Sequence, residues 1–256
     1  MNKISKAFEN GKAFIGFVTA GDPDLATSEQ IMLNMAKAGC DLIEIGIPFS
    51  DPIAEGPVIQ EANLRSLSQG TTTDKVFELT KKVSAQVDIP LVYMTYLNVL
   101  FKYGYDRFLQ NASDAGISGV IIPDMPFEEK DELQSVAKNY GIEVVSLIAP
   151  TSEDRIKMIA KNAEGFIYTV SSMGVTGTRN EIKTDLNSIT SAIKEVTDLP
   201  VAIGFGINTP EQAKKYSAIA DGVIVGSAIV KIIEQYGTNA PEKVFDYVKS
   251  MKDAIR

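Results

Sequence analysis

Two acidic residues in the segment LIEIGIPFSDPIAEGP, residues 42–57, are the first candidates for chemistry. If the segment opens with a β-strand, side-chain alternation places Glu44 on one face and three isoleucines on the other: Ile43, Ile45 and Ile47. The isoleucines suit contact with helices, so Glu44 is expected to point into the interior that the strands enclose. Burial there raises the pKa of a carboxyl group toward neutrality, as a general acid requires. The alternative is a structural carboxylate in an internal hydrogen-bond network.

Glu55 and Tyr168 are further candidates for the same site. Glu55 lies in the loop after this strand and is placed to reach over the mouth of the interior with a second carboxylate. The alternative for Glu55 is an ordinary solvated loop charge. Tyr168 shares one face of a later predicted strand with Phe166 and Val170, so a buried core tyrosine competes with a role at the site.

Three glycine-rich segments at the ends of predicted strands indicate a phosphate site. They are GVTG at 174–177, GFGIN at 204–208 and VGSAIVK at 225–231. Barrel enzymes often hold phosphate on backbone N–H groups after the last two strands and at the start of a short helix. Gly226 and Ser227 open such a helix here. Glycine also marks ordinary turns, so the indication comes from the three segments together.

Residue types that are missing narrow the reaction further. The sequence contains no histidine, which removes the usual acid/base of neutral pH and the commonest metal ligand. The predicted strands and their immediate ends carry no lysine, so a Schiff-base aldolase has no obvious nucleophile. Carboxylates are not clustered as metal ligands either. Acid/base catalysis without a metal is the chemistry that remains.

The elements that must position these residues alternate between strands and helices. Eight short β-rich runs are predicted, at residues 14–19, 41–47, 91–95, 119–123, 143–148, 166–171, 201–205 and 222–225. The segments between them carry apolar stripes at helical spacing: Leu133, Val136, Ala137 and Tyr140; Ile156, Ile159, Ala160 and Ala163; Ile189, Ala192, Ile193 and Val196. Alternating strands and helices form a parallel sheet, either a closed barrel or an open doubly wound sheet. Eight similar units and the ligand signals favour a (β/α)8 TIM barrel.

Boundary signals support these helices and leave two long connections. Gly39 and Gly141 stand where helices should end, and Thr209, Pro210 and Gln212 form a capping box with proline at the first helical position. Residues 48–69 and 172–185 are too long to be simple turns. Long insertions at the carboxyl ends of strands are typical of functional lids.

The bulk properties describe one globular domain. A length of 256 residues is close to what a (β/α)8 barrel needs, so residues 1–256 are expected to form a single catalytic domain. The net charge of −8 opposes binding to nucleic acid or to an anionic membrane. Cys40 is the only cysteine and is expected to pack in the core. The sequence has no long apolar run and no signal-peptide pattern, so a cytoplasmic location is expected.

Taken together, the motifs resemble one family over nearly the whole chain. FVTAGDP at 17–23, LIEIGIPFSDPIAEGP, the pair Pro123 and Asp124, GVTGTR, GFGI and VGSAIVKIIE look like the tryptophan synthase alpha subunit. The resemblance implies a lyase that cleaves indole-3-glycerol phosphate to indole and glyceraldehyde 3-phosphate by a retro-aldol reaction without metal or cofactor. Another phosphosugar barrel enzyme, such as an isomerase, and a non-catalytic activating subunit are the alternatives.

The resemblance also implies residue roles. Glu44 matches the catalytic glutamate and Tyr168 a tyrosine beside it, while Glu55 stands where the family usually has an aspartate that accepts from the indole N–H. Phosphate-binding positions match Gly177, Gly206, Gly226 and Ser227, and indole-pocket positions match Phe17, Met94, Ile121 and Phe205. Lid and partner contacts are implied for Asp51, Asn98, Asp124 and Thr176. The implied partner is a beta subunit that carries pyridoxal phosphate, in an alpha2beta2 heterotetramer.

Overall fold

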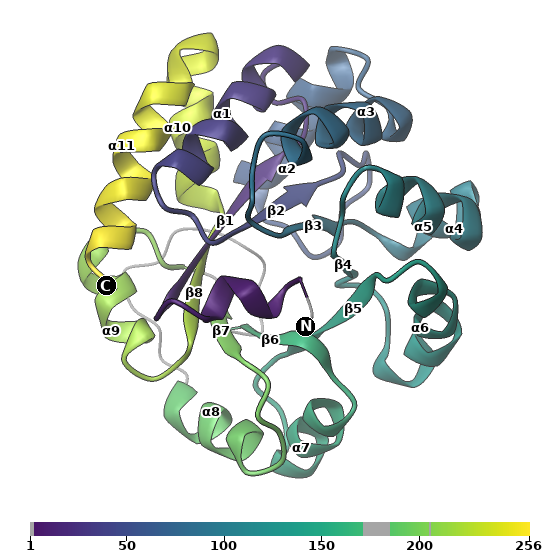
Figure 1. Cartoon of the computed structure of the whole chain (residues 1–256), viewed down its shortest axis with the longest axis vertical. Helices are drawn as coiled ribbons and strands as arrows, with labels where there is room; N and C mark the ends of the chain where they lie inside the picture. Colours follow the sequence, from purple (N-terminus) through teal and green to yellow (C-terminus); the bar gives the residue numbers. More distant parts are fainter. Residues whose placement is uncertain (1–2, 171–184, 205) are drawn as a thin grey trace.

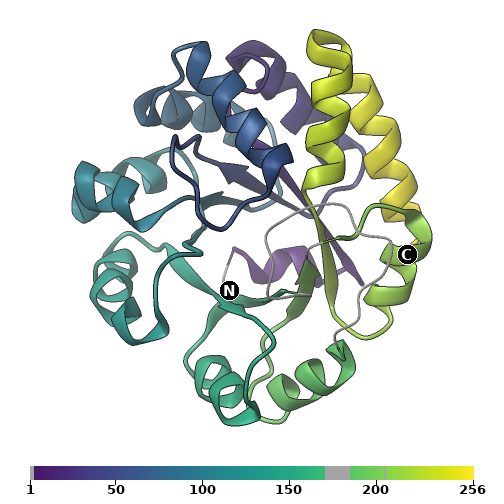
Figure 2. The same ribbon diagram turned by 180° about the vertical axis from the view of Figure 1, so that it is seen from behind.

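The computed structural model describes residues 3–170, 185–204 and 206–256. Eight parallel strands pair in sequence order and close into a barrel, with β8 returning to β1. Helices surround the strands on the outside (Figure 1; Figure 2). The predicted (β/α)8 barrel is therefore confirmed. The strands are β1 Ala13–Thr19, β2 Leu42–Gly46, β3 Leu91–Met94, β4 Gly119–Ile121, β5 Glu143–Ile148, β6 Glu164–Val170, β7 Val201–Gly204 and β8 Gly222–Val225.

Side-chain alternation along the strands builds two apolar layers. Ile43, Ile45 and Ile47 belong to the large outer core between strands and helices. Leu42, Phe166 and Tyr168 belong to the inner core inside the barrel. The face that β2 turns to the helices is therefore the one predicted from its isoleucines.

The helices form the outer layer around the strands. Their bounds are α1 Leu25–Lys37, α2 Pro57–Ser68, α3 Thr73–Ser84, α4 Leu97–Tyr103, α5 Tyr105–Asp114, α6 Lys130–Asn139, α7 Glu153–Lys161, α8 Leu186–Lys194, α9 Pro210–Ser217, α10 Ser227–Tyr236 and α11 Ala240–Asp253, with 3-10 turns η1 Ser5–Phe8, η2 Phe127–Glu129 and η3 Gly237–Asn239. The capping box at the start of α9 is present, with Thr209 and Gln212 bonding reciprocally. Gly39 and Gly141 follow helices with positive φ angles of 100° and 66°, which glycine adopts without strain.

The amino-terminal segment closes the end of the barrel at which the strands begin. Ile4 is fully buried in the inner core, and the Phe8 ring lies 5.8 Å from the Phe166 ring, between centroids. In Figure 1 this segment, with η1, crosses the barrel near the N label. Ile4 and Phe8 thus fill the barrel interior at this end, which leaves the opposite end, where the strands finish, for access to the interior.

The connection 48–69 is not only a loop, because its second half is a helix. Residues 57–68 form α2, which begins at Pro57 in the first helical turn and buries Ile59, Ala62, Asn63 and Ser66. The sequence pattern did not indicate this helix. Of the second long connection, 172–185, only Asp185 is among the described residues, and its carboxylate caps α8 by accepting from the backbone N–H groups of Asn187 and Ser188.

Candidate functional site

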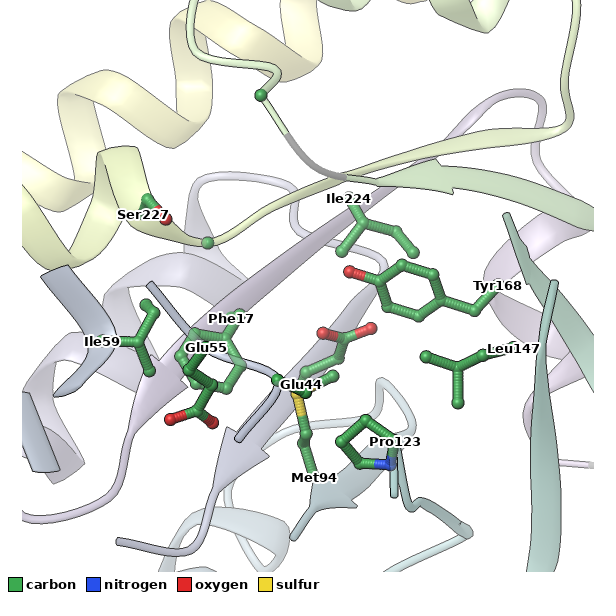
Figure 3. A pocket seen from close by; sticks show the side chains of 13 residues that line it. Phe17, Glu44, Glu55, Ile59, Met94, Pro123, Leu147, Tyr168, Ile224 and Ser227 are labelled. Carbon is green, nitrogen blue, oxygen red and sulfur yellow. The ribbon is translucent and has the colours of Figure 1, made fainter. Parts of the chain in front are cut away.

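A cavity opens where the strands end, and each of the eight strands contributes to its wall a residue of its own or one that follows it within two positions. The space between its walls is about 620 Å³ when the open mouth is included. The lining residues are Phe17, Glu44, Ala54, Glu55, Ile59, Met94, Pro123, Leu147, Tyr168, Gly206, Ile224, Gly226 and Ser227 (Figure 3). An apolar wall with a few polar groups is typical of a site that binds a small molecule.

Glu44 reaches the cavity from the inner face of β2. It is 0% exposed, and neither carboxyl oxygen has a hydrogen-bond partner in the part of the chain that the structure describes. Loss of solvation in this apolar environment raises the pKa of Glu44 from 4.5 to about 8. A carboxyl group with this pKa is protonated at neutral pH and is able to give its proton to a bound ligand. The alternative of a structural carboxylate held in an internal network is not supported by these contacts.

Tyr168 lies beside Glu44 on the inner face of β6. Figure 3 shows its ring on the side of the cavity toward which the Glu44 carboxyl group points. The side chain is 3% exposed, and burial raises the pKa of its hydroxyl well above 10, with the nearby Glu44 charge adding to the shift. Tyr168 therefore stays neutral across the physiological pH range. It belongs both to the inner core and to the cavity wall.

Glu55 closes one side of the cavity from the segment between β2 and α2. Its side chain is only 8% exposed, so it is not a solvated loop charge. The Asn63 amide donates to the Glu55 carboxylate at 2.8 Å, and the Gln60 amide donates to the Glu55 backbone carbonyl at 2.8 Å. Burial raises the pKa of Glu55 from 4.5 to about 7, and the bond from Asn63 works in the opposite direction. About half of this group is therefore ionised at neutral pH.

Asn63 and Ile59 are site residues that the sequence reasoning missed. They lie one helical turn apart on α2, on the same buried face as Ala62 and Ser66. Two signals were available: Pro57 after Gly56 is a common helix start, and residues 59, 62, 63 and 66 have helical spacing. Only two of those four residues are apolar, so the stripe did not stand out.

The glycine-rich ends of β7 and β8 meet at the rim of the cavity. Gly206 follows β7 with a φ of 81°, and Gly226 precedes Ser227 at the start of α10. Gly226 supplies no side-chain cap to this helix. The first N–H groups of a helix point along its axis and favour an anion. The phosphate-binding role predicted for Gly206, Gly226 and Ser227 stays a prediction, and Gly177 lies outside the described residues.

The residues predicted to hold an indole ring lie in different places. Phe17 and Met94 line the cavity from β1 and β3. Ile121 is fully buried in the inner core and is not one of the residues that line the cavity. Phe205 is outside the described residues. Leu147 and Ile224 contribute apolar wall that was not predicted.

The residues predicted to contact a partner lie around the same end of the barrel. Asp51 is exposed in the segment after β2, and Asn98 is exposed in the first turn of α4. The Asp124 carboxylate accepts from the Leu97 backbone N–H at 2.9 Å and so holds the start of α4. Thr176 is outside the described residues. Two large apolar side chains, Ile53 and Phe101, are each 74% exposed in the segments that carry Asp51 and Asn98.

Neither a metal-binding cluster nor a membrane-spanning helix is present in the described ranges. No group of three or more His, Cys, Asp or Glu side chains within them is arranged to hold a metal ion. None of the helices built from those residues is long and apolar enough to cross a membrane.

Comparison with known proteins gives one consistent result. The model of the family described as tryptophan synthase alpha chain matches residues 4–256. The tryptophan synthase alpha chain of Lacticaseibacillus casei is 47% identical over 255 residues, which cover 100% of this chain and 96% of that protein. The crystal structure of the tryptophan synthase alpha chain from Legionella pneumophila is similar with a TM-score of 0.88 and 36% identity, covering 100% of this chain and 97% of that one.

A structure of Mycobacterium tuberculosis tryptophan synthase is similar with a TM-score of 0.90 and 30% identity, covering 100% of this chain and 98% of that one. The similarity therefore extends over the whole barrel and includes the segments that line the cavity. The chain belongs to the tryptophan synthase alpha chain family.

Proposed function

We propose that Glu44 and Glu55 carry out the alpha reaction of tryptophan synthase in this chain. This reaction is the cleavage of indole-3-glycerol phosphate to indole and glyceraldehyde 3-phosphate in tryptophan biosynthesis. The observation that supports the proposal most strongly is the arrangement of Glu44, a buried carboxyl group without a described partner that faces an apolar cavity. A second buried carboxylate and a glycine-lined rim stand on the other sides of the same cavity.

The proposed reaction begins with proton transfer from Glu44. With a pKa of about 8, Glu44 enters the reaction protonated and gives its proton to C3 of the indole ring. The ring then carries a positive charge that is shared with its nitrogen. Glu55, ionised in about half of the molecules at pH 7, accepts a hydrogen bond from the indole N–H and stabilises this charge.

The bond between carbon atoms breaks in the second step. Glu44, now a carboxylate, removes the proton from the hydroxyl group on the adjacent glycerol carbon. The oxygen forms the aldehyde, and the electrons of the breaking bond return to the ring, which leaves as neutral indole. Glu44 is protonated again, so one residue serves as acid and then as base. Tyr168 lies beside it as a neutral neighbour that keeps water away from the carboxyl group.

The phosphate of the substrate is assigned to the rim of the cavity. Gly206, Gly226 and Ser227 offer backbone N–H groups and the start of α10 to an anion. The apolar wall made by Phe17, Met94 and its neighbours is assigned to the indole ring. The proposed chemistry uses no metal and no cofactor in this chain, and residues 1–256 act as one catalytic domain.

A beta subunit is the proposed partner, in an alpha2beta2 heterotetramer in the cytoplasm. The similarity to a structure titled as Mycobacterium tuberculosis tryptophan synthase supports this assignment. Ile53 and Phe101, which lie near Asp51 and Asn98 in the sequence, are exposed apolar side chains of the kind that protein interfaces cover. Pyridoxal phosphate is assigned to the partner, which consumes the indole.

The test is an assay of the purified chain with indole-3-glycerol phosphate, in which indole and glyceraldehyde 3-phosphate are measured separately. The proposal predicts equal amounts of both products. A phosphosugar isomerase would release no indole, and a non-catalytic subunit would release none while still activating a beta subunit. Either result would contradict the proposed function.

A further inference from the structure

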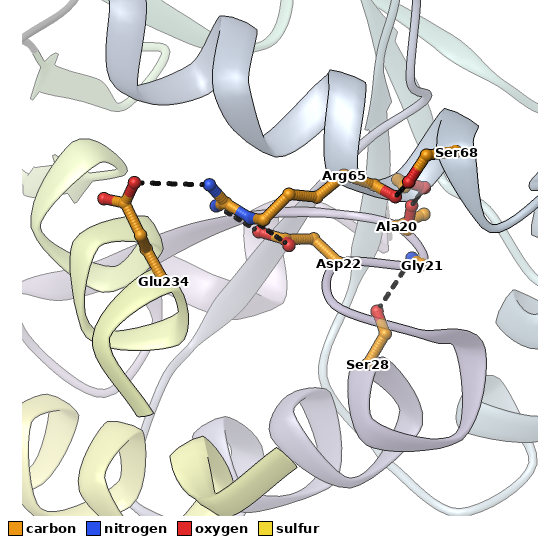
Figure 4. Close-up of polar contacts among 8 residues, drawn as sticks. Ala20, Gly21, Asp22, Ser28, Arg65, Ser68 and Glu234 are labelled. Carbon is orange, nitrogen blue, oxygen red and sulfur yellow. Dashed lines mark hydrogen bonds and ion pairs between the residues drawn. The ribbon is translucent and has the colours of Figure 1, made fainter. Parts of the chain in front are cut away.

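A partly buried ion pair joins α2 to the loop after β1, and neither of its residues lines the cavity. The Arg65 guanidinium donates from Nε to one carboxylate oxygen of Asp22 at 2.8 Å and from a terminal nitrogen to the other at 2.9 Å (Figure 4). The Asp22 side chain is 0% exposed, whereas the Arg65 side chain is 28% exposed. Two parallel bonds to one carboxylate fix direction as well as distance.

Arg65 also reaches α10, the helix whose first turn forms the rim of the cavity. A terminal nitrogen of its guanidinium lies 3.4 Å from a carboxylate oxygen of Glu234. Figure 4 shows the guanidinium between Asp22 and Glu234. Arg65 therefore connects the loop after β1, α2 and α10, the three segments that surround one side of the cavity mouth.

A second contact ties the same helix to the same loop. The Ser66 hydroxyl donates to the Ala20 carbonyl at 2.6 Å, next to Gly21. A Cβ atom at Gly21 would lie 2.4 Å from the Thr71 hydroxyl and 2.7 Å from the Ser66 hydroxyl, so the backbone approaches the end of α2 too closely for any side chain. Helix α2 is thus held at its last turns by residues that have no place in the cavity wall.

The first turn and the middle of the same helix carry the site residues Ile59 and Asn63. Ile59 lines the cavity, and Asn63 donates to the Glu55 carboxylate at 2.8 Å. Asn63 and Arg65 are two residues apart in a rigid helix. A rotation or shift of the helix at Arg65 would therefore move the Asn63 amide relative to the Glu55 carboxylate, whose own position depends on that bond.

We propose that Arg65, through its paired bonds to Asp22, is a positioning residue for the lyase reaction that sets the place of α2 and, through Asn63, of the Glu55 carboxylate. The inference rests on the proposed function, because it assumes that Glu55 takes part in the reaction. Arg65 acts without touching the substrate. Its loss lowers kcat more than it changes KM, because the contact from Glu55 strengthens as charge develops on the ring.

The test is a double-mutant cycle on the full chain between Arg65→Lys and Asn63→Leu. Lysine keeps the charge of Arg65 but cannot make the paired bonds. In the parent chain, Arg65→Lys is expected to lower kcat about 10-fold and to change KM less than about 2-fold. In the Asn63→Leu background the same change is expected to lower kcat less than about 2-fold, because its route to Glu55 is already broken. Equal losses in both backgrounds would overturn the proposal.

A matched control and a second variant keep the test decisive. Arg155 makes a similar two-bond pair with Glu128, at 2.7 and 3.2 Å, and neither residue lines the cavity, so Arg155→Lys should leave kcat within about 2-fold. Asp22→Asn weakens the pair from the other side and is expected to reproduce the kcat loss of Arg65→Lys. A folded Asp22→Asn chain with the parent's kcat would also overturn the proposal.

A titration separates this inference from the proposed function. In the ligand-free chain, the Glu55 carboxyl group is followed by ¹³C NMR and assigned with Glu55→Gln. Arg65→Lys is expected to raise the pKa of Glu55 by about 0.5 to 1 unit, since the Asn63 bond that lowers it is weakened. This shift is measurable even if the chain released no indole, which would refute the function alone. An unchanged titration would refute the positioning role alone.

Discussion

Replacing Asn63 with leucine tests how the protein keeps Glu55 partly ionised. Leucine has the same side-chain branching as asparagine, although it is bulkier, and it removes the amide that donates to the Glu55 carboxylate at 2.8 Å. A hydrogen bond to a charged group contributes about 1.5–3 kcal/mol, and one pKa unit corresponds to about 1.4 kcal/mol. The pKa of Glu55, about 7 in the parent chain, should therefore rise by about 1 to 2 units.

The expected loss of activity follows from the ionised fraction of Glu55. At pH 7 that fraction falls from about one half to between about one in ten and one in a hundred, so kcat should fall about 5- to 50-fold. In the parent chain, activity rises as Glu55 ionises near pH 7 and falls as Glu44 loses its proton near pH 8. Asn63→Leu raises only the pKa of Glu55, so the pH of maximal activity should rise and the maximal activity itself should fall.

The assay is the steady-state rate of indole release between pH 5.5 and 9.5. Asn111→Leu is the control, because Asn111 lies on α5 and does not line the cavity. Its amide donates to the Tyr103 hydroxyl at 2.8 Å, so the control also removes one amide hydrogen bond. This control should keep the parent's profile. If Asn63→Leu kept the parent's acid limb and its kcat within about 2-fold, the Asn63 bond would have no part in setting the ionisation of Glu55.

Three further predictions concern other parts of the cavity. Gly226→Asp places a negative charge at the start of α10 and should raise KM for indole-3-glycerol phosphate at least about 10-fold, while the Kd of free indole changes little. Gly226→Ala is the control and should be tolerated, because its Cβ would lie 3.4 Å from Phe17. Equal losses of affinity for both ligands would show that the phosphate binds elsewhere. Gly46→Ala would bring a Cβ to 2.6 Å from the Phe17 ring, so kcat/KM should fall about 10-fold as the ring is displaced into the cavity, and an unchanged kcat/KM would refute this packing. Burial raises the pKa of Glu44 from 4.5 to about 8, so the stability that its protonated form gives is complete below pH 4.5 and is lost as the pH rises toward 8. The free energy of unfolding of Glu44→Gln, measured in urea, should therefore equal that of the parent at pH 4.5 and exceed it by about 2–5 kcal/mol at pH 8. A difference that does not change with pH would argue against the raised pKa.

The barrel and the position of Glu44 follow from local patterns in the sequence. Period-2 alternation in β2 puts Glu44 opposite three isoleucines, and helical stripes such as Ile189, Ala192 and Ile193 are long enough to read. These patterns depend only on which face of an element is apolar, so they can be recognised in the sequence without knowledge of the tertiary structure.

The surroundings of Glu55 were not predictable in the same way. A charged residue in a segment rich in proline and glycine looks solvated, and its burial depends on α2 folding back over it. Two of the four residues on the buried face of α2 are polar, Asn63 and Ser66, because they bond to Glu55 and Ala20. A helix whose inner face is used for hydrogen bonds lacks the apolar stripe by which helices are recognised.

The most direct test of the proposed chemistry is single-turnover indole release by Glu44→Gln. Glutamine keeps the shape of Glu44 and removes the group that titrates near pH 8. Substrate binding should stay within a few-fold of the parent, and the rate of indole release should fall about 10²- to 10⁴-fold, as expected for loss of a general acid and base. A folded Glu44→Gln chain that releases indole at close to the parent's rate would contradict the assignment of Glu44 as the group that moves the proton.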